Sequence, residues 1–433
     1  MQQLNTDATP RQFNLELCFD ASLKRPSQAR RDLASELAGF REFNQTTRTF
    51  LIAAGNQTVK AFVNEYWTAR QRQANSLHEV SYRACFKPQL PRFFIERLTA
   101  PGDVVYDPFM GRGTTPLEAA LLGRVPFGND ANPLSRLMVQ PRLNPPQLAA
   151  IESRLRQIYF QQDLPCPGEL LAFYHPDTLK ALCSLRHYLL ERQAANSLDL
   201  VDEWIWLVAI NRLTGHSSGF FSVYTLPPNQ AVSVKSQLKI NEKRNQVPPK
   251  RDVPKLIYKK SRQLLGDIDT PTRSTLAQVA PQARLSTAQA DSTSEIPPDS
   301  VQLVVTSPPF LNVVQYATDN WLRGWFGGID SKTVNLTTPA RLEAWAEKMT
   351  QVFGELNRVL RPGGYVAFEV GEIHGGATRL EETVIPCGAT AGLNPLLVVI
   401  NDQKFTKTAN CWGIDNMSKG TNTNRVVVFQ KPH

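Results

Sequence analysis

Two short segments of the sequence combine residue types that suit chemistry on a bound ligand. The first is 107–115 (DPFMGRGTT), in which Gly111 and Gly113 allow a tight backbone turn and a close approach of a ligand to the main chain. A helix is expected directly after this loop, and the free N–H groups at its start favour a negative ligand group such as a carboxylate. The second segment is 306–310 (TSPPF), which follows an apolar run typical of a buried strand.

The glycine loop does not match the common phosphate-binding patterns. The sequence lacks GxxxxGK[ST], and Gly113 is followed by TTP, which departs from GxGxxG. A glycine pair alone predicts only a turn, but Asp107, Asp130 and Asp291 each follow an expected strand. Asp130 is placed to accept two hydrogen bonds from a ribose diol, and Asp291 to face an adenine amino group. The loop and the three acids together predict a site for a nucleoside-bearing cofactor.

The TSPPF segment suits an exocyclic amino group. Its two prolines lack an amide N–H and have a fixed φ, which indicates a rigid turn with outward carbonyls. The Ser307 hydroxyl and the Pro308 carbonyl could both accept hydrogen bonds from one amine, and Phe310 offers a ring face to a base drawn out of a duplex. Such acceptors would aim the nitrogen lone pair at a methyl group without a covalent intermediate. By itself the motif predicts a proline turn, but its place after a strand of a cofactor-binding sheet favours catalysis.

Alternating strands and helices are expected around both segments, which predicts an α/β fold. Strands are expected at 104–106, 125–128, 284–286, 300–306, 365–370, 396–400 and 425–429, and helices at 114–122 and 344–360. Further helices are expected at 28–39, 57–73, 148–160, 177–193 and 199–213. Loops are expected to dominate after 213, and part of 270–298 has the composition of a flexible linker.

This pattern predicts four regions. They are an N-terminal extension that is mostly helical (1–75), a first half of the core with the cofactor loop (76–146), a long and largely helical insertion (147–282), and a second half of the core with SPPF (283–433).

These residues resemble the amino-methylating DNA methyltransferases, the N4/N6 DNA methylase family, which use S-adenosyl-L-methionine. DPFMGRGTT is similar to the first cofactor motif, GNDANP (128–133) to the second and AQADS (288–292) to the third, while HEVSYRACFKPQLP (78–91) resembles the segment that closes over the methionine end of the cofactor. TSPPF is similar to the catalytic tetrapeptide of the cytosine-N4 members. The resemblance covers about 76–146 and 283–433.

The resemblance implies a Rossmann-like, doubly wound methyltransferase sheet and a set of site residues. The implied cofactor-binding residues are Lys87, Asp107, Phe109, Gly111, Gly113, Thr114, Thr115, Asp130, Asn132 and Asp291. The implied catalytic residues are Ser307, Pro308, Pro309 and Phe310.

The chain also departs from the family pattern. Phe310 stands where Tyr is usual, and Met110 and Arg112 occupy positions that are commonly small. The long insertion between the second and third motifs does not fit the usual permutation classes. Carbon-5 methylation of cytosine is disfavoured, because it needs a cysteine nucleophile and neither Cys166 nor Cys387 lies in a Pro-Cys-Gln loop.

Most of the net charge is concentrated in the insertion. The chain has a formal charge of +9, and 235–262 holds ten basic and two acidic residues, a net charge of +8. Basic side chains bind phosphates, whereas a basic run alone predicts only a solvated face or a linker. If the chain acts on DNA, residues 235–262 and the polar residues near them form the candidate DNA interface. The candidate DNA-binding residues are Arg212, His216, Ser217, Lys235, Lys239, Lys243, Arg244 and Tyr316.

The sequence therefore predicts a cytosine-N4 DNA methyltransferase that converts S-adenosyl-L-methionine into S-adenosyl-L-homocysteine. Double-stranded DNA is the expected partner, with a cognate restriction endonuclease as a further candidate. Adenine-N6 methylation, methylation of guanine N2 in RNA and a catalytically silent nucleic-acid-binding subunit remain alternatives. Neither a spanning apolar run, nor a signal peptide, nor a metal-binding cysteine spacing is found in the sequence, so no membrane, no metal and a prokaryotic cytoplasmic or nucleoid location are expected.

Overall fold

The structure is a computed structural model of the 433-residue chain. It describes residues 32–68, 74–83, 85–226, 230–309, 316–330, 334, 339, 341–370, 372–373, 378–402 and 423–433.

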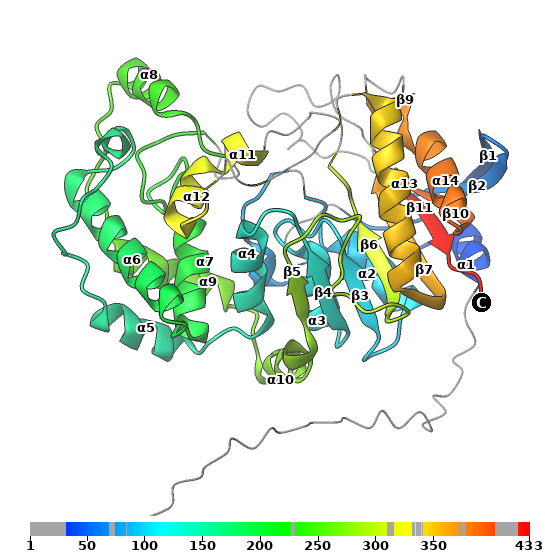
Figure 1. The fold of residues 1–433 in the computed structure, drawn as a ribbon, viewed down its shortest axis with the longest axis horizontal. Helices are drawn as coiled ribbons and strands as arrows, with labels where there is room; N and C mark the ends of the chain where they lie inside the picture. Colours follow the sequence, from blue (N-terminus) through cyan, green and yellow to red (C-terminus); the bar gives the residue numbers. More distant parts are fainter. Residues whose placement is uncertain are drawn as a thin grey trace, which may run out of the picture.

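A large mixed sheet forms the centre of the described part of the chain (Figure 1). Its order is β1-β2-β10-β11-β7-β6-β3-β4-β5. The strands are β1 (Arg48–Ala54), β2 (Gln57–Asn64), β3 (Val104–Asp107), β4 (Val125–Asn129), β5 (Arg284–Ser286), β6 (Val301–Thr306), β7 (Leu360–Val370), β10 (Asn394–Asp402) and β11 (Thr423–Gln430). Strands β5, β4, β3, β6 and β7 run parallel, and β11 lies antiparallel between β7 and β10. The carboxyl ends of β3, β4 and β6 therefore meet at one edge of the sheet.

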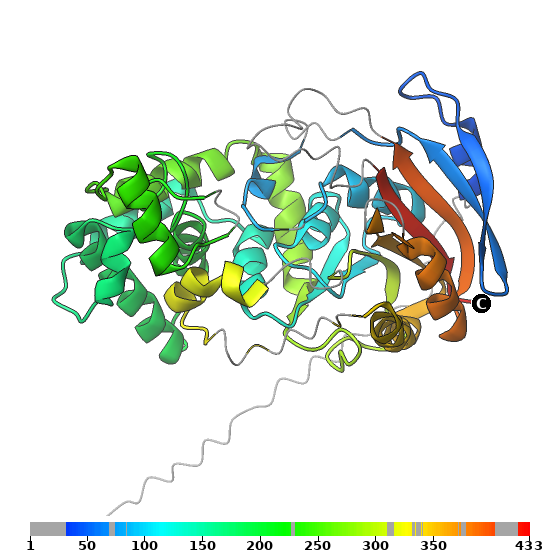
Figure 2. The same cartoon turned by 90° about the horizontal axis from the view of Figure 1, so that it is seen from above.

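Helices cover both faces of this sheet (Figure 2). On one face, α13 (Leu342–Val359) and α14 (Leu380–Thr390) bury apolar side chains against the strands, and the Phe353 ring lies 4.7 Å from that of Phe368. On the other face, α1 (Leu33–Gly39) and α2 (Gln89–Leu98) cover Val105 and Leu303, beside α3 (Thr114–Leu121). Helices on both faces of the sheet, together with its parallel strands, confirm the expected α/β fold with a doubly wound sheet.

The N-terminal region corrects one prediction. The helix expected over 57–73 is wrong, because 57–64 forms strand β2, which pairs with β1 in a hairpin and with β10 in parallel. Val59, Ala61 and Val63 are buried at every second position, and β-branched residues favour a strand. The hairpin turns at Gly55, whose φ is +58°. Residues 69–73 lie outside the described part.

The insertion forms a helical body beside the β5 end of the sheet (Figures 1 and 2). Its helices are α5 (Leu148–Gln157), α6 (Pro176–Ala194), α7 (Leu200–Ile210), α8 (Val234–Arg244) and α9 (Val253–Leu264). The buried side chains of Phe173, Trp204 and Ile257 belong to one apolar cluster with Tyr82 and Met110 near the cofactor loop. The insertion and the loop therefore share a core.

The stretch after 213 is more helical than expected. Helices α8 and α9 occupy part of the predicted loops, and α10 (Thr270–Val279) occupies part of the predicted linker. Asp252 and Asp269 accept hydrogen bonds from backbone amides at the starts of α9 and α10. Pro254 and Pro271 stand in the first turn of these helices, where a missing amide costs nothing, so they do not act as helix breakers.

The shorter elements connect these parts. They are α4 (Leu134–Leu143), α11 (Tyr316–Asp319), α12 (Trp321–Gly327), η2 (Ser76–His78), η3 (Gly168–Ala172), η4 (Ala280–Gln282) and the small ribbon of β8 (Glu372–Ile373) and β9 (Thr378–Arg379). Of the helices in the described ranges, none has the length and apolarity needed to cross a membrane.

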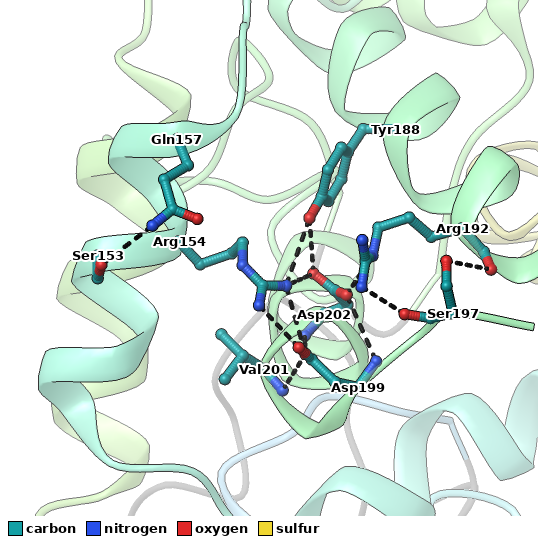
Figure 3. Close-up of polar contacts among 9 residues, drawn as sticks. All are labelled: Ser153, Arg154, Gln157, Tyr188, Arg192, Ser197, Asp199, Val201 and Asp202. Carbon is teal, nitrogen blue, oxygen red and sulfur yellow. Dashed lines mark hydrogen bonds and ion pairs between the residues drawn. The ribbon is translucent and has the colours of Figure 1, made fainter.

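An ion-pair cluster joins three helices of the insertion (Figure 3). Asp202 on α7 is fully buried and binds Arg154 of α5, Arg192 of α6 at 2.6 Å and the Tyr188 hydroxyl at 3.0 Å. Asp199 also pairs with Arg154, at 2.7 Å, and caps the start of α7. The buried carboxylate thus fixes the relative positions of α5, α6 and α7.

Removal of this carboxylate should destabilise the insertion. We expect Asp202→Ala to lower the free energy of unfolding by about 3 kcal/mol, because two arginines lose a buried partner. Glu152→Ala breaks only the exposed Glu152–Arg156 pair and should cost less than about 0.5 kcal/mol. Denaturant unfolding of both variants measures the difference. Equal losses would show that Asp202 does not hold the helices together.

Candidate active site

The glycine loop turns from β3 into α3 through two left-handed residues. Gly111 has a φ of +48° and Gly113 of +76°. A Cβ atom on Gly113 would lie 2.3 Å from Val139 Cγ2, so this position has no room for a side chain. A Cβ on Gly111 would lie 3.5 Å from the Tyr82 ring, in ordinary contact. Gly113 therefore packs the loop against α4, and Gly111 faces the segment that contains Tyr82.

Asp107, at the end of β3, joins the two chemical segments. It is buried and accepts hydrogen bonds from Thr306 Oγ1 at 2.6 Å and from the Phe109 amide at 3.0 Å. Burial raises the pKa of Asp107 to about 7, although the hydrogen bond from Thr306 lowers it. Because Thr306 precedes Ser307, this bond places the start of SPPF beside the cofactor loop.

The two threonines that follow the loop are buried in the first turn of α3. Thr115 donates a hydrogen bond to the Val305 carbonyl at 3.0 Å, which adds a second link between α3 and β6. The Thr114 hydroxyl accepts a bond from Arg112 at 3.3 Å. The hydrogen bonds of both side chains thus stabilise the glycine loop and the start of α3.

Asp130 and Asn132 shape the loop after β4. Asp130 accepts hydrogen bonds from the amides of Gly111 and Asn132, both at 2.8 Å, and Asn132 accepts one from the Leu134 amide at the start of α4. A carboxylate has about four acceptor positions, so two remain on Asp130 for a ribose diol. Asp130 therefore holds the glycine loop and can still bind a ligand.

Only one of the two carboxylate oxygens of Asp291 has a partner among the described residues. Its Oδ2 lies 2.5 Å from Lys348 Nζ, whereas its Oδ1 is buried without a hydrogen-bond partner among the described residues. A buried acceptor of this kind costs free energy unless a ligand satisfies it. The position therefore fits the expected adenine amino group.

Residues 76–83 and 85–88, which we call the cover segment, lie against the glycine loop. Arg112 donates to the Val80 carbonyl at 2.8 Å, and Arg142 donates to the carbonyls of Leu77, at 3.1 Å, and Arg112. Burial and the nearby Arg112 lower the pKa of Arg142 to about 9. Lys87 lies on the exposed side of the segment. Two guanidinium groups therefore hold the cover segment and the loop together, close to where a ligand carboxylate is expected.

The structure describes part of the TSPPF segment. Ser307 and Pro309 are half-buried and Pro308 is buried at the end of β6, and the Pro309 carbonyl accepts a hydrogen bond from Trp345 at 3.0 Å. Phe310 and the side chain of Tyr316 lie outside the described residues.

Sequence reasoning missed two residues of this site, Thr306 and Arg142. Thr306 ends the apolar strand β6 and reaches Asp107, so an isolated polar residue in an apolar element was the available signal. Helix α4 carries two arginines, Arg136 and Arg142, so the sequence held no such signal for Arg142.

The candidate DNA-binding residues lie apart from this centre. Lys235, Lys239, Lys243 and Arg244 are exposed on α8, on the same upper side of Figure 1 as α11. The Arg244 guanidinium lies 3.7 Å from the centre of the Tyr224 ring. These cations thus form an exposed basic helix at the end of the insertion.

The other candidates near α8 differ in exposure. His216 and Ser217 are exposed, whereas Arg212 is half-buried with its guanidinium 4.0 Å from the centre of the Phe220 ring. Burial lowers the pKa of Arg212 to about 10. The amide side chains of Gln237, Asn241 and Gln246 bind one another and main-chain carbonyls. They position α8 rather than extend from it.

The described residues hold no group of three or more His, Cys, Asp or Glu side chains arranged for a metal ion.

Known proteins resemble parts of the chain. Residues 23–134 match a family model for N6/N4 methylases, described as DNA methylase; the match includes the glycine loop and ends before TSPPF. Type II methyltransferase M.MjaII of Methanocaldococcus jannaschii is 34% identical over 74 residues, 17% of this chain and 14% of that protein. Type II methyltransferase M.BsoBI of Geobacillus stearothermophilus is 37% identical over 75 residues, 16% of this chain and 15% of that protein. The chain thus aligns with about one seventh of each relative.

Among solved structures, a TehB-like methyltransferase of Corynebacterium glutamicum, described as SAM-dependent, is 9% identical over 80% of this chain and 89% of that chain, with a TM-score of 0.29. The fold assignment rests on the strand order of the chain itself. The family match confirms the resemblance to N4/N6 DNA methylases expected from the motifs, and it extends into 23–75, which the motifs do not cover.

The packing of the loop leads to a prediction at Gly113. We expect Gly113→Ala to lower the free energy of unfolding by about 3 kcal/mol, from a left-handed alanine and from the clash with Val139. In the double variant Gly113→Ala/Val139→Ala, the clash should be relieved, and only the cost of a left-handed alanine should remain. Gly39→Ala is the control, since a Cβ there meets no atom within 4 Å. Thermal unfolding measures all three, and a Gly113→Ala variant as stable as the parent would refute the packing role.

Proposed function

We propose that the chain, whose sequence resembles the N4/N6 DNA methylases, is an S-adenosyl-L-methionine-dependent DNA methyltransferase that modifies the N4 amine of cytosine. The observation that carries the proposal is the 2.6 Å hydrogen bond between Thr306 and Asp107, which sets Ser307 beside the cofactor loop. The choice of cytosine N4 rests on the residue types of TSPPF, and adenine N6 is the alternative target. The match to the family model described as DNA methylase supports DNA as the substrate, and we propose that this DNA is double-stranded.

The residues around the glycine loop fit this cofactor. Asp130 has acceptor positions left for the ribose diol, and Asp291 Oδ1 is open to the adenine amino group. Arg112 and Arg142 place positive charge beside the loop, where a carboxylate is favoured. When bound, S-adenosyl-L-methionine supplies an electrophilic methyl group, and S-adenosyl-L-homocysteine is the product that leaves.

The catalytic segment orients the amine. The Ser307 oxygen and the Pro308 carbonyl each accept one N–H of the exocyclic amine of an extruded base, which turns the nitrogen lone pair toward the methyl group. Phe310 supplies the stacking face in this proposal. The chain therefore contributes orientation and hydrogen-bond acceptors and forms no covalent bond to the base.

Three of the four regions expected from the sequence have a role in this proposal. The regions 76–146 and 283–433 form the two halves of the catalytic core, and 147–282 binds DNA through α8, with Arg212, His216, Ser217 and Tyr316 as further contacts. By analogy with the Type II relatives, we propose a cognate restriction endonuclease as a partner and the prokaryotic cytoplasm as the location.

Two substitutions test the assigned roles. Ser307→Ala should lower turnover on the order of a hundredfold while cofactor affinity stays within about twofold, because it removes an acceptor for the amine. Asp130→Ala should weaken cofactor binding about tenfold or more, because it frees the Gly111 amide and removes the ribose acceptor. Transfer of labelled methyl groups into DNA, and calorimetry with the cofactor, give the two quantities. If both variants lost only cofactor binding, the assigned roles would be wrong.

The basic face of α8 leads to a second test. Charge reversal at Lys239 and Lys243, both exposed on α8, should weaken DNA binding. It should also lower the slope of log K against log salt concentration by about two, because each phosphate contact contributes about 0.9 to this slope. Lys60→Glu is a control that reverses one exposed charge on β2, at the opposite end of the sheet (Figure 1). Fluorescence anisotropy over a salt series measures the slope. An unchanged slope in the α8 variant would remove this helix from the interface.

A further inference from the structure

Arg244, in the last turn of α8, has an exposed side chain with an aromatic support. The central carbon of its guanidinium lies 3.7 Å from the centre of the Tyr224 ring, and a planar guanidinium stacks on an aromatic face at this distance. The structure gives this guanidinium no hydrogen bond or ion pair to any described residue. Its N–H groups are therefore available to a ligand.

The support under Arg244 is itself held in place. The Tyr224 carbonyl accepts hydrogen bonds from the side-chain amides of Gln237 and Gln246, at 3.0 and 2.9 Å. Both amides also donate to Asn241 Oδ1 at 2.8 Å, and the Asn241 amide donates to the Ala172 carbonyl at 2.7 Å. Because this network fixes Tyr224 relative to α8, Arg244 loses little conformational freedom when it binds a ligand.

The other cations of α8 are of a different type. Lys235, Lys239 and Lys243 are exposed and recur every four residues, so they form a stripe along the helix. A lysine carries a compact charge on a flexible stem, which suits a phosphate. An arginine carries a rigid fork of donors that can bind O6 and N7 of one guanine together, the commonest specific contact in the major groove. Helix α8 thus combines side chains suited to phosphates with one suited to a base edge.

The start of α8 is connected to the segment that follows TSPPF. The Ala231 amide donates to the Asp319 carbonyl at 2.9 Å, and the Trp321 indole donates to the Val232 carbonyl at 3.1 Å. Asp319 ends α11 and Trp321 begins α12. DNA that presents a base to SPPF therefore passes close to α8.

Arg212 offers an informative comparison, because it is also stacked on a ring. Its guanidinium lies 4.0 Å from the centre of the Phe220 ring, but its Nε donates to the Asn211 carbonyl at 2.9 Å and its side chain is half-buried. Arg244 keeps all of its donors and is exposed, so it is better placed to contact a base.

We propose, on the basis of the proposed function, that Arg244 is a specificity-determining residue. It reads one guanine of the recognition sequence, outside the target base pair, through hydrogen bonds to O6 and N7 in the major groove, while Tyr224 fixes the plane of its guanidinium.

Arg244→Gln and Lys239→Gln form a matched pair of tests, since each removes one exposed positive charge from α8. The variants and the parent methylate unmethylated genomic DNA, and sequencing that detects methylated bases gives the base preference at each position of the site. In Arg244→Gln, the preference for guanine at one position should fall at least tenfold, and adenine should gain most, because glutamine binds adenine N6 and N7. Lys239→Gln should weaken methylation of all sites equally and leave the base preferences unchanged.

Tyr224→Leu tests the support. It removes the ring face but keeps the main-chain carbonyl that Gln237 and Gln246 bind. The same guanine position should become less selective, by a smaller factor than in Arg244→Gln. Thermal unfolding checks that the variant is folded, and an unchanged preference in a folded Tyr224→Leu would overturn the role of the ring.

The outcomes separate this proposal from the proposed function. If Arg244→Gln keeps the base preferences of the parent at every position, with its rate unchanged or uniformly lowered, Arg244 reads no base and its proposed role is overturned. A parent that methylates no DNA would overturn the proposed function, and with it the role of Arg244. A parent that methylates only adenine would overturn the cytosine assignment, and the same sequencing would still measure the guanine preference.

Discussion

The hydrogen bond between Thr306 Oγ1 and Asp107 Oδ1 is the contact on which the candidate active site depends. It spans 2.6 Å between two buried side chains at the ends of neighbouring strands, β6 and β3. Asp107 begins the glycine loop and Thr306 precedes SPPF, so one bond aligns the glycine loop with the SPPF segment. Loss of the bond would leave a buried polar group unsatisfied, which typically costs about 1–3 kcal/mol. Thr115 supports the same alignment through the Val305 carbonyl.

The helical insertion is built onto this centre through the cover segment. Lys260 of α9 pairs with Glu79 at 3.3 Å, and the Ser76 hydroxyl donates to the Leu264 carbonyl at 2.8 Å. On its other side, the segment binds Arg112 and Arg142 of the cofactor half. The basic helix α8 belongs to the same helical body as α9. The expected DNA-binding helix is therefore connected to the glycine loop through α9 and the cover segment.

The sequence predicted the parts of the fold in which local pattern and tertiary context agree. The apolar runs of β3 and β6, and the loop with glycines at positions 111 and 113, could be identified because buried parallel strands and left-handed turns restrict residue choice. Strand β2 was mistaken for a helix, because its pairing with β10 depends on a strand more than 300 residues away. The hydrogen bonds of the Gln237 amide to the Tyr224 carbonyl and to Asn241 depend on side-chain packing, which a local sequence pattern does not show.

The most direct test of the account is the identity of the methylated base. Unmethylated double-stranded DNA is incubated with the protein and labelled S-adenosyl-L-methionine, digested to nucleosides and separated by chromatography with mass detection. The account predicts label in N4-methylcytosine. Label in N6-methyladenine alone would contradict the cytosine assignment, and DNA without label would contradict methyl transfer by this site.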